Sequence, residues 1–124
     1  MDDKEILSEI DRCIRMEAEA VGRLTKLQNK EALLRTVHAI CDCTGKVILS
    51  GCGTSAMAAK KIQHSLNCVE RPALFLTPSD AVHGGLGVLQ KEDILILISK
   101  GGNTEELVRL IPACKTKGAL LIAV

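Results

Sequence analysis

Two short segments rich in glycine and hydroxyl side chains could bind an anion in this 124-residue chain. They are Gly51–Ser55 (GCGTS) and Ser99–Thr104 (SKGGNT), and each follows an apolar run that is typical of a strand. A glycine-rich turn between a strand and a helix exposes backbone N–H groups and directs a helix N-terminus at its ligand, which suits phosphate. Because both segments have this context, we expect them to form one phosphate pocket.

Three kinds of residue in these segments suit a phosphate. The glycines allow close backbone approach, the hydroxyls donate hydrogen bonds, and Lys100 can neutralise charge. The expected substrate-binding residues are Gly53, Thr54, Ser55, Ser99, Lys100, Gly101, Gly102 and Thr104. The alternative is that the first segment is only a tight turn and the second only a capping box. Two interpretations are also open for Glu106: it is an ordinary acid in the first turn of a helix, or its carboxylate is turned toward the ligand.

A histidine lies in a third glycine-rich segment, Ala81–Gly87 (AVHGGLG), before the third expected strand. Histidine titrates near neutral pH and can move protons, so His83 and Glu106 are the candidate catalytic residues. The alternative for His83 is a structural hydrogen-bonding role. His38 and His64 fall in expected helices and fit the structural role better.

A dinucleotide-binding domain is disfavoured by what the first segment lacks. GCGTS has no third glycine, and no acidic residue ends the second expected strand, where a ribose hydroxyl would need one. The segment also lacks the lysine of a P-loop.

The composition excludes several other classes of protein. Hydrophobic residues make up 47% of the chain, which excludes disorder, and the net charge of +1 argues against a nucleic-acid surface. Phe75 is the single aromatic residue, so a sugar would be held by hydrogen bonds rather than by stacking. The polar N-terminus is not a signal peptide, no apolar run approaches a membrane span, and the six cysteines match no zinc pattern. We therefore expect a cytoplasmic protein with no metal, cofactor, nucleic-acid partner or membrane partner.

The hydrophobic pattern alternates between helical and strand periods. It predicts helices at 3–28, 30–43, 55–66 and 104–115 and strands at 46–50, 72–76, 94–98 and 119–124. We expect Ser79 or Asp80 to cap a short helical turn, and Asn103 or Thr104 to cap the last helix, which Pro112 should kink or end.

Apolar strands that alternate with helices predict an α/β fold with a doubly wound parallel sheet. In a flavodoxin-like strand order, the first and third strands are neighbours and ligands bind beyond their carboxyl ends. The two glycine-rich segments follow these two strands. We divide the chain into an N-terminal helical segment, 1–44, and a second domain, 45–124.

The three segments GCGTS, PSDAVHGGLGVL and SKGGNT resemble the sugar isomerase (SIS) domain, most closely the arabinose-5-phosphate isomerases. The resemblance covers about Gly45–Val124 and implies a flavodoxin-like SIS fold. It also implies binding of a phosphorylated sugar and aldose–ketose isomerisation through an enediol, here of D-arabinose 5-phosphate and D-ribulose 5-phosphate. By this resemblance four residues with hydroxyl side chains hold the phosphate: Thr54, Ser55, Ser99 and Thr104. The resemblance also implies that His83 and Glu106 lie near the sugar, often across a subunit interface.

The chain departs from the subgroup at three positions. Thr54 stands where the subgroup commonly has lysine, Gly101 replaces a serine, and Asn103 replaces a glutamate. The family's later catalytic histidine and glutamate would lie beyond Val124, so we expect a partial SIS domain with four strands and little isomerase activity of its own. The alternative function is a non-catalytic sugar-phosphate-binding or sensing module.

The N-terminal helical pattern carries more apolar surface than a four-stranded sheet can cover. Together with the family resemblance, this predicts a homo-oligomer, a dimer or tetramer.

Overall fold

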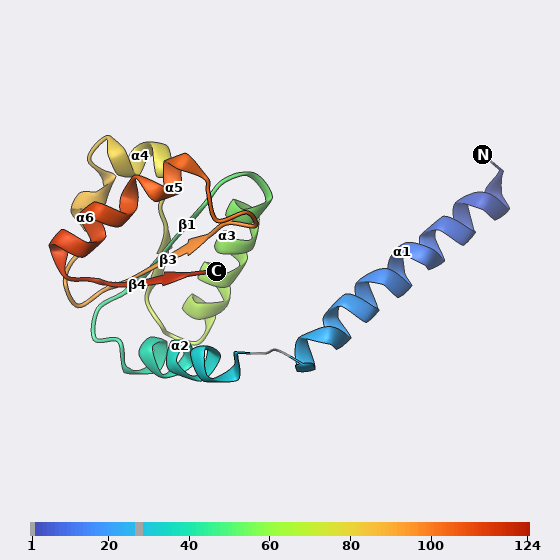
Figure 1. The fold of residues 1–124 in the computed structure, drawn as a ribbon, viewed down its shortest axis with the longest axis horizontal. Coiled ribbons are helices and arrows are strands. Elements are labelled where there is room, and N and C mark those ends of the chain that lie inside the picture. The colour runs from blue at the N-terminus through green and yellow to red at the C-terminus, as the bar shows by residue number, and fades with distance from the viewer. Residues whose placement is uncertain (1, 27–28) are drawn as a thin grey trace. The chain divides into compact units, whose positions relative to one another are not determined.

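The computed structural model describes residues 2–26 and 29–124 (Figure 1). Its internal contacts divide the chain into two compact units, residues 1–35 and residues 36–124. The division at residues 44 and 45 stays a prediction.

The first unit is dominated by a long helix, α1 (Asp3–Arg23), followed by the 3-10 turn η1 (Leu24–Lys26). Asp2 and Glu5 form a capping box, in which each side chain accepts a 2.8 Å hydrogen bond from the other residue's N–H. The predicted helix is confirmed over Asp3–Arg23, and its last two residues, Leu27 and Gln28, lie outside the described residues. No residue of α1 is buried.

Helix α2 (Lys30–Asp42) begins in the first unit and ends in the second. Its N-terminus is capped by Asn29, whose side-chain oxygen accepts from the Ala32 N–H at 3.0 Å. Its C-terminal residues Ala39 and Ile40 pack against the core of the second unit.

The second unit is built around a four-stranded parallel sheet in the order β2-β1-β3-β4. This order confirms the predicted doubly wound sheet, with the first and third strands as neighbours. The strands are β1 (Val47–Gly51), β2 (Ala73–Phe75), β3 (Ile94–Ile98) and β4 (Leu120–Ala123). The remaining elements are α3 (Gly53–Cys68), α4 (Pro78–Val82), η2 (Gly85–Val88), α5 (Glu105–Val108) and α6 (Leu110–Lys117).

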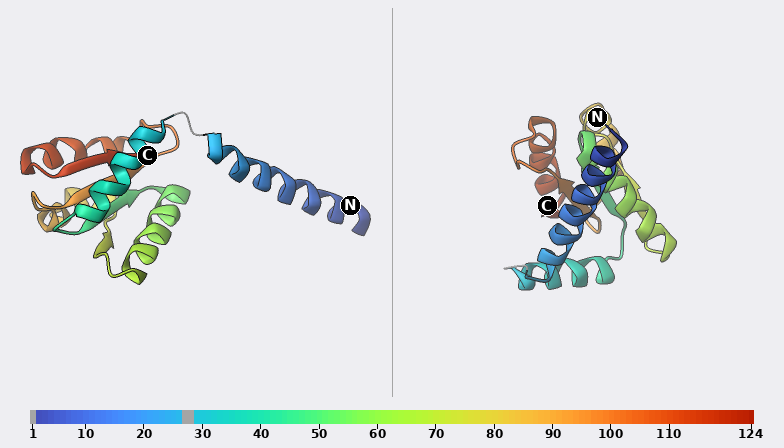
Figure 2. Two further views of the ribbon diagram at one scale, coloured as in Figure 1. Left: turned by 90° about the horizontal axis from the view of Figure 1, so that it is seen from below. Right: turned by 90° about the vertical axis from the view of Figure 1, so that its right-hand side faces the viewer.

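Each face of the sheet has its own hydrophobic core, with helices against both faces (Figure 2). On one face, Ile48 and Leu95 pack with Leu107 of α5 and Leu110 of α6. On the other face, the residues that precede and follow Ile48 in β1 and Leu95 in β3 pack with Ala59 of α3 and with the end of α2. Successive strand side chains point to opposite faces, so a sheet covered on both sides needs strands that are apolar throughout.

Two predicted details at helix ends are wrong. The short helix α4 is capped by Thr77 rather than by Ser79 or Asp80, because Pro78 takes the first helical position and leaves the cap to the residue before it. Thr77 Oγ1 accepts from the Asp80 N–H at 3.1 Å and donates to Asp80 Oδ2 at 2.6 Å.

The last helix is interrupted earlier than predicted. It divides at Arg109 into α5 and α6, three residues before Pro112. A proline ring collides with the carbonyl four residues earlier, here that of Val108, and supplies no N–H to it. The disturbance that Pro112 causes is therefore seen one turn upstream.

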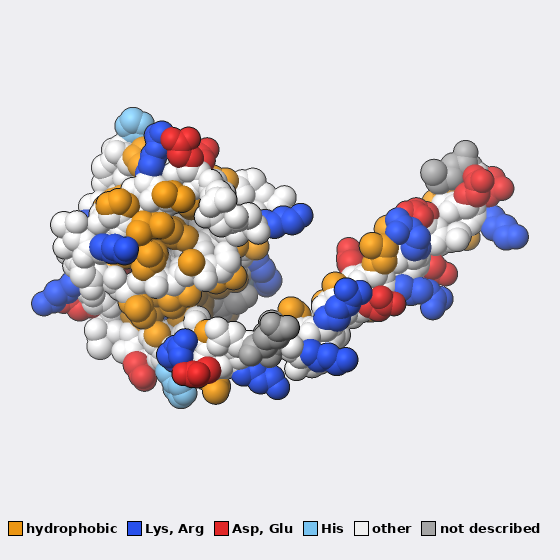
Figure 3. Space-filling view, viewed as in Figure 1, with side chains coloured by type: hydrophobic (Ala, Val, Ile, Leu, Met, Phe, Trp, Pro, Cys, Tyr) orange, Lys and Arg blue, Asp and Glu red, His pale blue; other side chains and the backbone are white. Residues whose placement is uncertain are grey.

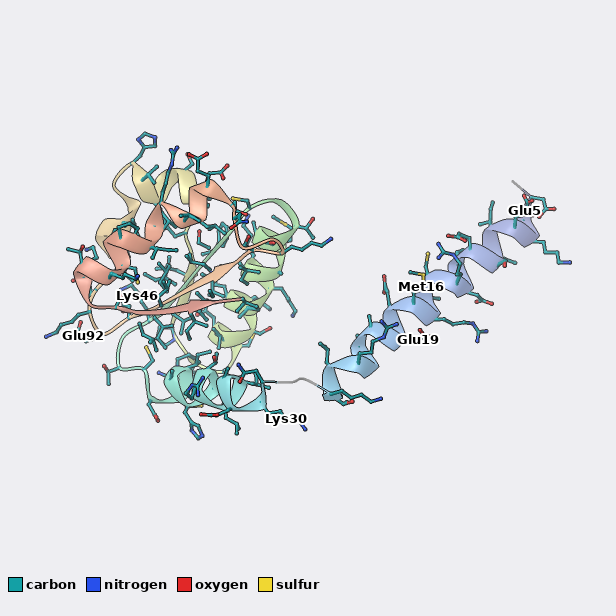
Figure 4. The ribbon with its side chains drawn as sticks, in the orientation of Figure 1. Glu5, Met16, Glu19, Lys30, Lys46 and Glu92 are labelled. Atoms are coloured by element: carbon teal, nitrogen blue, oxygen red, sulfur yellow. The ribbon has the colours of Figure 1, made fainter. Side chains whose placement is uncertain are left out.

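An ion pair braces β1 and β3 where both strands begin. Asp93, which is 3% exposed, accepts hydrogen bonds from the Lys46 ammonium at 2.6 Å, the Lys46 N–H at 2.8 Å and the Gln90 N–H at 2.7 Å. Burial alone would raise the pKa of Asp93, but these hydrogen bonds and the Lys46 charge outweigh it and hold the pKa below its usual value. A Cβ on Gly45 would lie 2.3 Å from Asp93 Oδ1, so the brace requires glycine there. Figure 4 labels Lys46 at this end of the sheet.

The surface of the second unit is partly apolar. Figure 3 shows hydrophobic side chains gathered over α6 and β4, and Leu120 of β4 is 48% exposed.

Among the described residues, none of the helices combines the length and the apolar character that crossing a membrane requires.

Candidate functional site

The first glycine-rich segment joins β1 to the N-terminus of α3. A Cβ on Gly51 would lie 2.9 Å from the backbone of Ser55, so only glycine allows the strand to end this close to the helix. Gly53 has a φ of 55°, in the left-handed region that favours glycine. Cys52 occupies the N-cap position and makes no side-chain cap hydrogen bond. The first N–H groups of the 16-residue helix α3 are therefore donors that a bound anion can meet.

The second segment, which follows β3, is organised by Ser99. The Ser99 hydroxyl accepts from the Gly102 N–H at 3.1 Å and lies 2.9 Å from the Thr104 hydroxyl. The Ser99 N–H donates to the Val124 carbonyl at 2.8 Å, which ties the segment to the end of β4. Gly102 has a φ of 72°, which allows the tight turn.

The two segments line one cavity of about 460 Å³ at the carboxyl ends of the strands. It is an open cavity, and both β1 and β3 end beside it. Four predicted substrate-binding residues meet here: Thr54 and Ser55 from the first segment, and Ser99 and Lys100 from the second. The other lining residues are Cys52, Ala58, Ile98 and Val124. Parallel packing of two neighbouring strands brings these segments together although more than 40 residues separate them.

The electrostatics of the cavity combine a lysine, a helix N-terminus and a nearby carboxylate. Lys100 is exposed on the cavity wall and carries a positive charge. Burial raises the pKa of the Cys52 thiol, and the negative charge of Glu106 raises it further. The thiol therefore stays protonated at neutral pH, and Glu106 acts electrostatically on the first segment.

Several predicted site residues lie outside this cavity. Gly102 lines a smaller, apolar cavity of about 200 Å³ that shares Ser99 and Val124 with the first. Gly101 and Thr104 line neither of the two, and the Gly102 N–H is turned to Ser99. Thr104 is the N-cap residue of α5, yet its hydroxyl is engaged with Ser99 instead of capping the helix.

Both predicted catalytic residues are exposed and stand off the cavity wall. His83 follows α4 as its C-cap residue, and its N–H donates to the Asp80 carbonyl at 3.2 Å. Glu106 is the second residue of α5, one position short of the place that a capping box requires. His38 and His64 are also exposed, on α2 and α3, so none of the three histidines is a core residue.

Sequence reasoning missed several wall residues for two different reasons. Cys52 lies within the first motif, but its thiol has no evident part in binding a phosphate. Ile98 and Val124 are predicted only as strand residues. Each is the last residue of its predicted strand. Because ligands bind beyond the carboxyl ends of adjacent parallel strands, this position could have identified both residues.

The described residues hold no group of three histidine, cysteine, aspartate or glutamate side chains placed to bind a metal ion.

Comparison with known proteins identifies the second unit by family. The model of the SIS domain family matches residues 40–124. Over 122 residues the chain is 34% identical to the arabinose 5-phosphate isomerase KpsF of Escherichia coli O6:H1. A crystal structure of a candidate sugar-phosphate isomerase from Listeria monocytogenes has 64% sequence identity and a TM-score of 0.97 over 99% of this chain. The E. coli CFT073 protein c3406, solved in complex with arabinose 5-phosphate, has 30% identity and a TM-score of 0.92, also over 99% of this chain.

The chain is shorter than these proteins. Its match spans 37% of the KpsF protein, 64% of the Listeria chain and 65% of the c3406 chain.

Proposed function

This chain belongs to the SIS domain family, and on that premise we propose that it binds a phosphorylated sugar in the cavity between Gly51–Ser55 and Ser99–Thr104. The observation that carries the proposal is the meeting of the two segments in one cavity, at the uncapped N-terminus of α3. Backbone N–H groups of the first turn of α3 receive the phosphate, the Ser55 hydroxyl donates to it, and Lys100 balances its charge.

In the complete protein, we propose that this site serves an aldose–ketose isomerase. The relatives named arabinose 5-phosphate isomerase, and the c3406 complex with that sugar phosphate, support D-arabinose 5-phosphate as the aldose. The ketose that we propose with it is D-ribulose 5-phosphate. A base removes the proton on the carbon next to the carbonyl, which gives an enediol. The same proton equivalent then returns to the neighbouring carbon, so no oxidant or reductant is consumed. His83 and Glu106 are the proposed acid–base groups.

His83 is exposed and does not line the cavity of its own chain, so we propose that it acts on a sugar that a second copy of the chain binds. This is the functional reason for the homo-oligomer that we also propose. His83 lies in a glycine-rich turn, in which Gly84 has a φ of 109°. Its imidazole ring is exposed and does not pack in the core of its own unit.

The second candidate is a sugar-phosphate-binding module without catalysis. It is favoured by one observation: the cavity gathers four predicted binding residues and neither of the predicted catalytic ones. Isomerisation assays of the complete protein with pentose and hexose phosphates separate the two candidates, since only the enzyme converts any of them.

Replacing Ser55 by Ala tests the phosphate site. The loss of one charge-assisted hydrogen bond should weaken binding of D-arabinose 5-phosphate by about 1–3 kcal/mol, which is roughly a 5- to 150-fold rise in Kd. Titration calorimetry with the sugar phosphate and with inorganic phosphate measures it, and both ligands should lose affinity.

The matched control is Ser65→Ala, because Ser65 is an exposed serine near the other end of the same helix. It should leave the Kd unchanged. Equal affinity of the Ser55→Ala variant and the parent would show that the phosphate binds elsewhere.

A further inference from the structure

We propose that the apolar stripe of α1 pairs with the same stripe of a second copy of this chain, with the two helices antiparallel. The apolar stripe is defined as Ile6, Ile10, Ile14 and Val21 of α1, together with its C-cap residue Leu24, where η1 begins. The proposal specifies one contact of the homo-oligomer proposed above and needs no sugar to be bound.

Helix α1 has an apolar side that no described residue of its own unit covers. The exposed fractions along the stripe run from 42% for Ile6 to 65% for Val21, and no residue of α1 is buried. The spacing of the stripe places all of its members on one face of a helix. Part of this face is hollowed into an apolar groove of about 300 Å³ lined by Ile6, Glu9, Ile10, Cys13 and Ile14. Most of the stability of a helix in a protein comes from packing of its apolar face, so the exposed face of α1 favours a partner.

The distribution of charge along residues 2–26 selects a second copy of this chain as the partner. Residues 2–11 contain five carboxylates and one lysine, whereas residues 12–26 contain four arginine or lysine residues and two glutamates. Charged side chains flank the apolar ones along α1 in Figure 3. A parallel second copy would place acidic half beside acidic half. An antiparallel copy places each acidic half beside a basic half, so the stripe is complementary to itself in one orientation.

The spacing of the stripe also gives the register. Its ends, Ile6 and Leu24, are 18 residues apart, which is about 27 Å along a helix axis. An antiparallel pair centred near residue 15 brings Ile6 opposite Leu24 and Ile10 opposite Val21. Glu17 lies on the same face close to this centre, so the two copies of Glu17 approach each other. The pair therefore carries one repulsive element at its middle.

Replacing Ile10 by Asp tests the contact. Two carboxylates per dimer would enter the apolar interface, and the dissociation constant should rise by about a hundredfold or more. Sedimentation equilibrium of the 124-residue chain over a range of concentrations measures it. The matched control is Met16→Asp, which makes the same kind of change on an exposed residue of α1 that lies off the apolar stripe (labelled in Figure 4). Its dissociation constant should stay near that of the parent.

Glu17→Leu gives the opposite result if the register is right. Removal of the central repulsion and addition of apolar area should tighten the dimer by about tenfold or more. Orientation is read by mixing an Ile6→Cys variant with a Leu24→Cys variant, both in a Cys13→Ser background, and mapping disulfides by mass spectrometry. Bridges between positions 6 and 24 support the antiparallel pair, and bridges within one variant, 6 to 6 or 24 to 24, support a parallel pair and overturn it.

Two further results would overturn the proposal. One is a parent chain that is monomeric at micromolar concentration, and the other is an Ile10→Asp chain that associates as tightly as the parent. Neither result affects the proposed phosphate site, because phosphate binding is measured separately. Conversely, loss of sugar binding in the Ser55→Ala variant leaves the α1 contact standing.

Discussion

An Asp93→Asn variant is expected to lose about 2–4 kcal/mol of its free energy of unfolding. The substitution removes a buried charge that accepts three hydrogen bonds and leaves the Lys46 ammonium without its counter-ion. We place the loss below that of a fully buried pair because the Lys46 side chain keeps 27% of its surface in solvent. Urea unfolding followed by circular dichroism measures the difference.

The adjacent residue supplies the matched control. Glu92 makes an exposed ion pair with Lys91 at 3.6 Å, and both side chains are solvated (Glu92 is labelled in Figure 4). The Glu92→Gln variant should therefore change the free energy of unfolding by less than about 0.5 kcal/mol. If the Asp93→Asn variant were as stable as the Glu92→Gln variant, the brace would have no energetic importance.

The pH dependence of stability should identify Asp93 as the group responsible. The folded chain holds the pKa of Asp93 below its unfolded value of about 3.9, so the unfolded state binds the proton more readily. The stabilisation is thus fully present above the unfolded pKa and is lost as the pH falls through the lower folded pKa. The difference in unfolding free energy between the parent and the Asp93→Asn variant should be constant near neutral pH and shrink in acid. A difference that stayed constant into acid would show that charge is not its cause.

A His83→Gln variant of the complete protein is expected to turn over its sugar phosphate about 10²- to 10⁴-fold more slowly. This is the usual loss when a positioned acid–base group is removed. Glutamine keeps the size and a hydrogen bond but cannot take up a proton, so kcat should fall while substrate affinity changes little. Initial rates with D-arabinose 5-phosphate, and binding of the same sugar by calorimetry, separate the two effects.

His38→Gln is the matched control, because His38 is an exposed histidine on α2. It should retain the parent's rate. Unchanged turnover and affinity in the His83→Gln variant would reject the proposed role and favour the non-catalytic module.

The features that could be predicted from the sequence are those that depend on local pattern. The apolar runs at Val47 and Ile94 are strands, the glycine-rich segments follow them, and the β1–β3 neighbourhood places both segments at one cavity. Periodicity, turn residues and the handedness of crossovers are sufficient for this level of description.

The features that could not be predicted depend on contacts distant in sequence or on competition for one group. The Lys46–Asp93 brace joins residues 47 positions apart, and no pattern in the sequence marks such a pair. Thr104 is predicted to cap a helix or to bind phosphate, but its hydroxyl has a neighbour in Ser99, which local pattern does not reveal. The Arg109 break is displaced from the proline that causes it, because the disturbed carbonyl lies one turn away.

The pairing of β1 with β3 also limits how this chain can change in length. The two strands run in step from Val47 opposite Ile94 to Gly51 opposite Ile98, with five residues in each. A one-residue deletion in β3 would draw Ser99 back by about 3.3 Å and reverse the faces to which the strand's side chains point. The cavity needs both strands to end at the same height, and the Lys46–Asp93 brace fixes where both begin, so insertions and deletions should be tolerated only away from these strands, within surface loops such as that around Glu70. Substitutions that alter the ligand can accumulate in GCGTS and SKGGNT, while the spacing that holds the two segments level stays fixed.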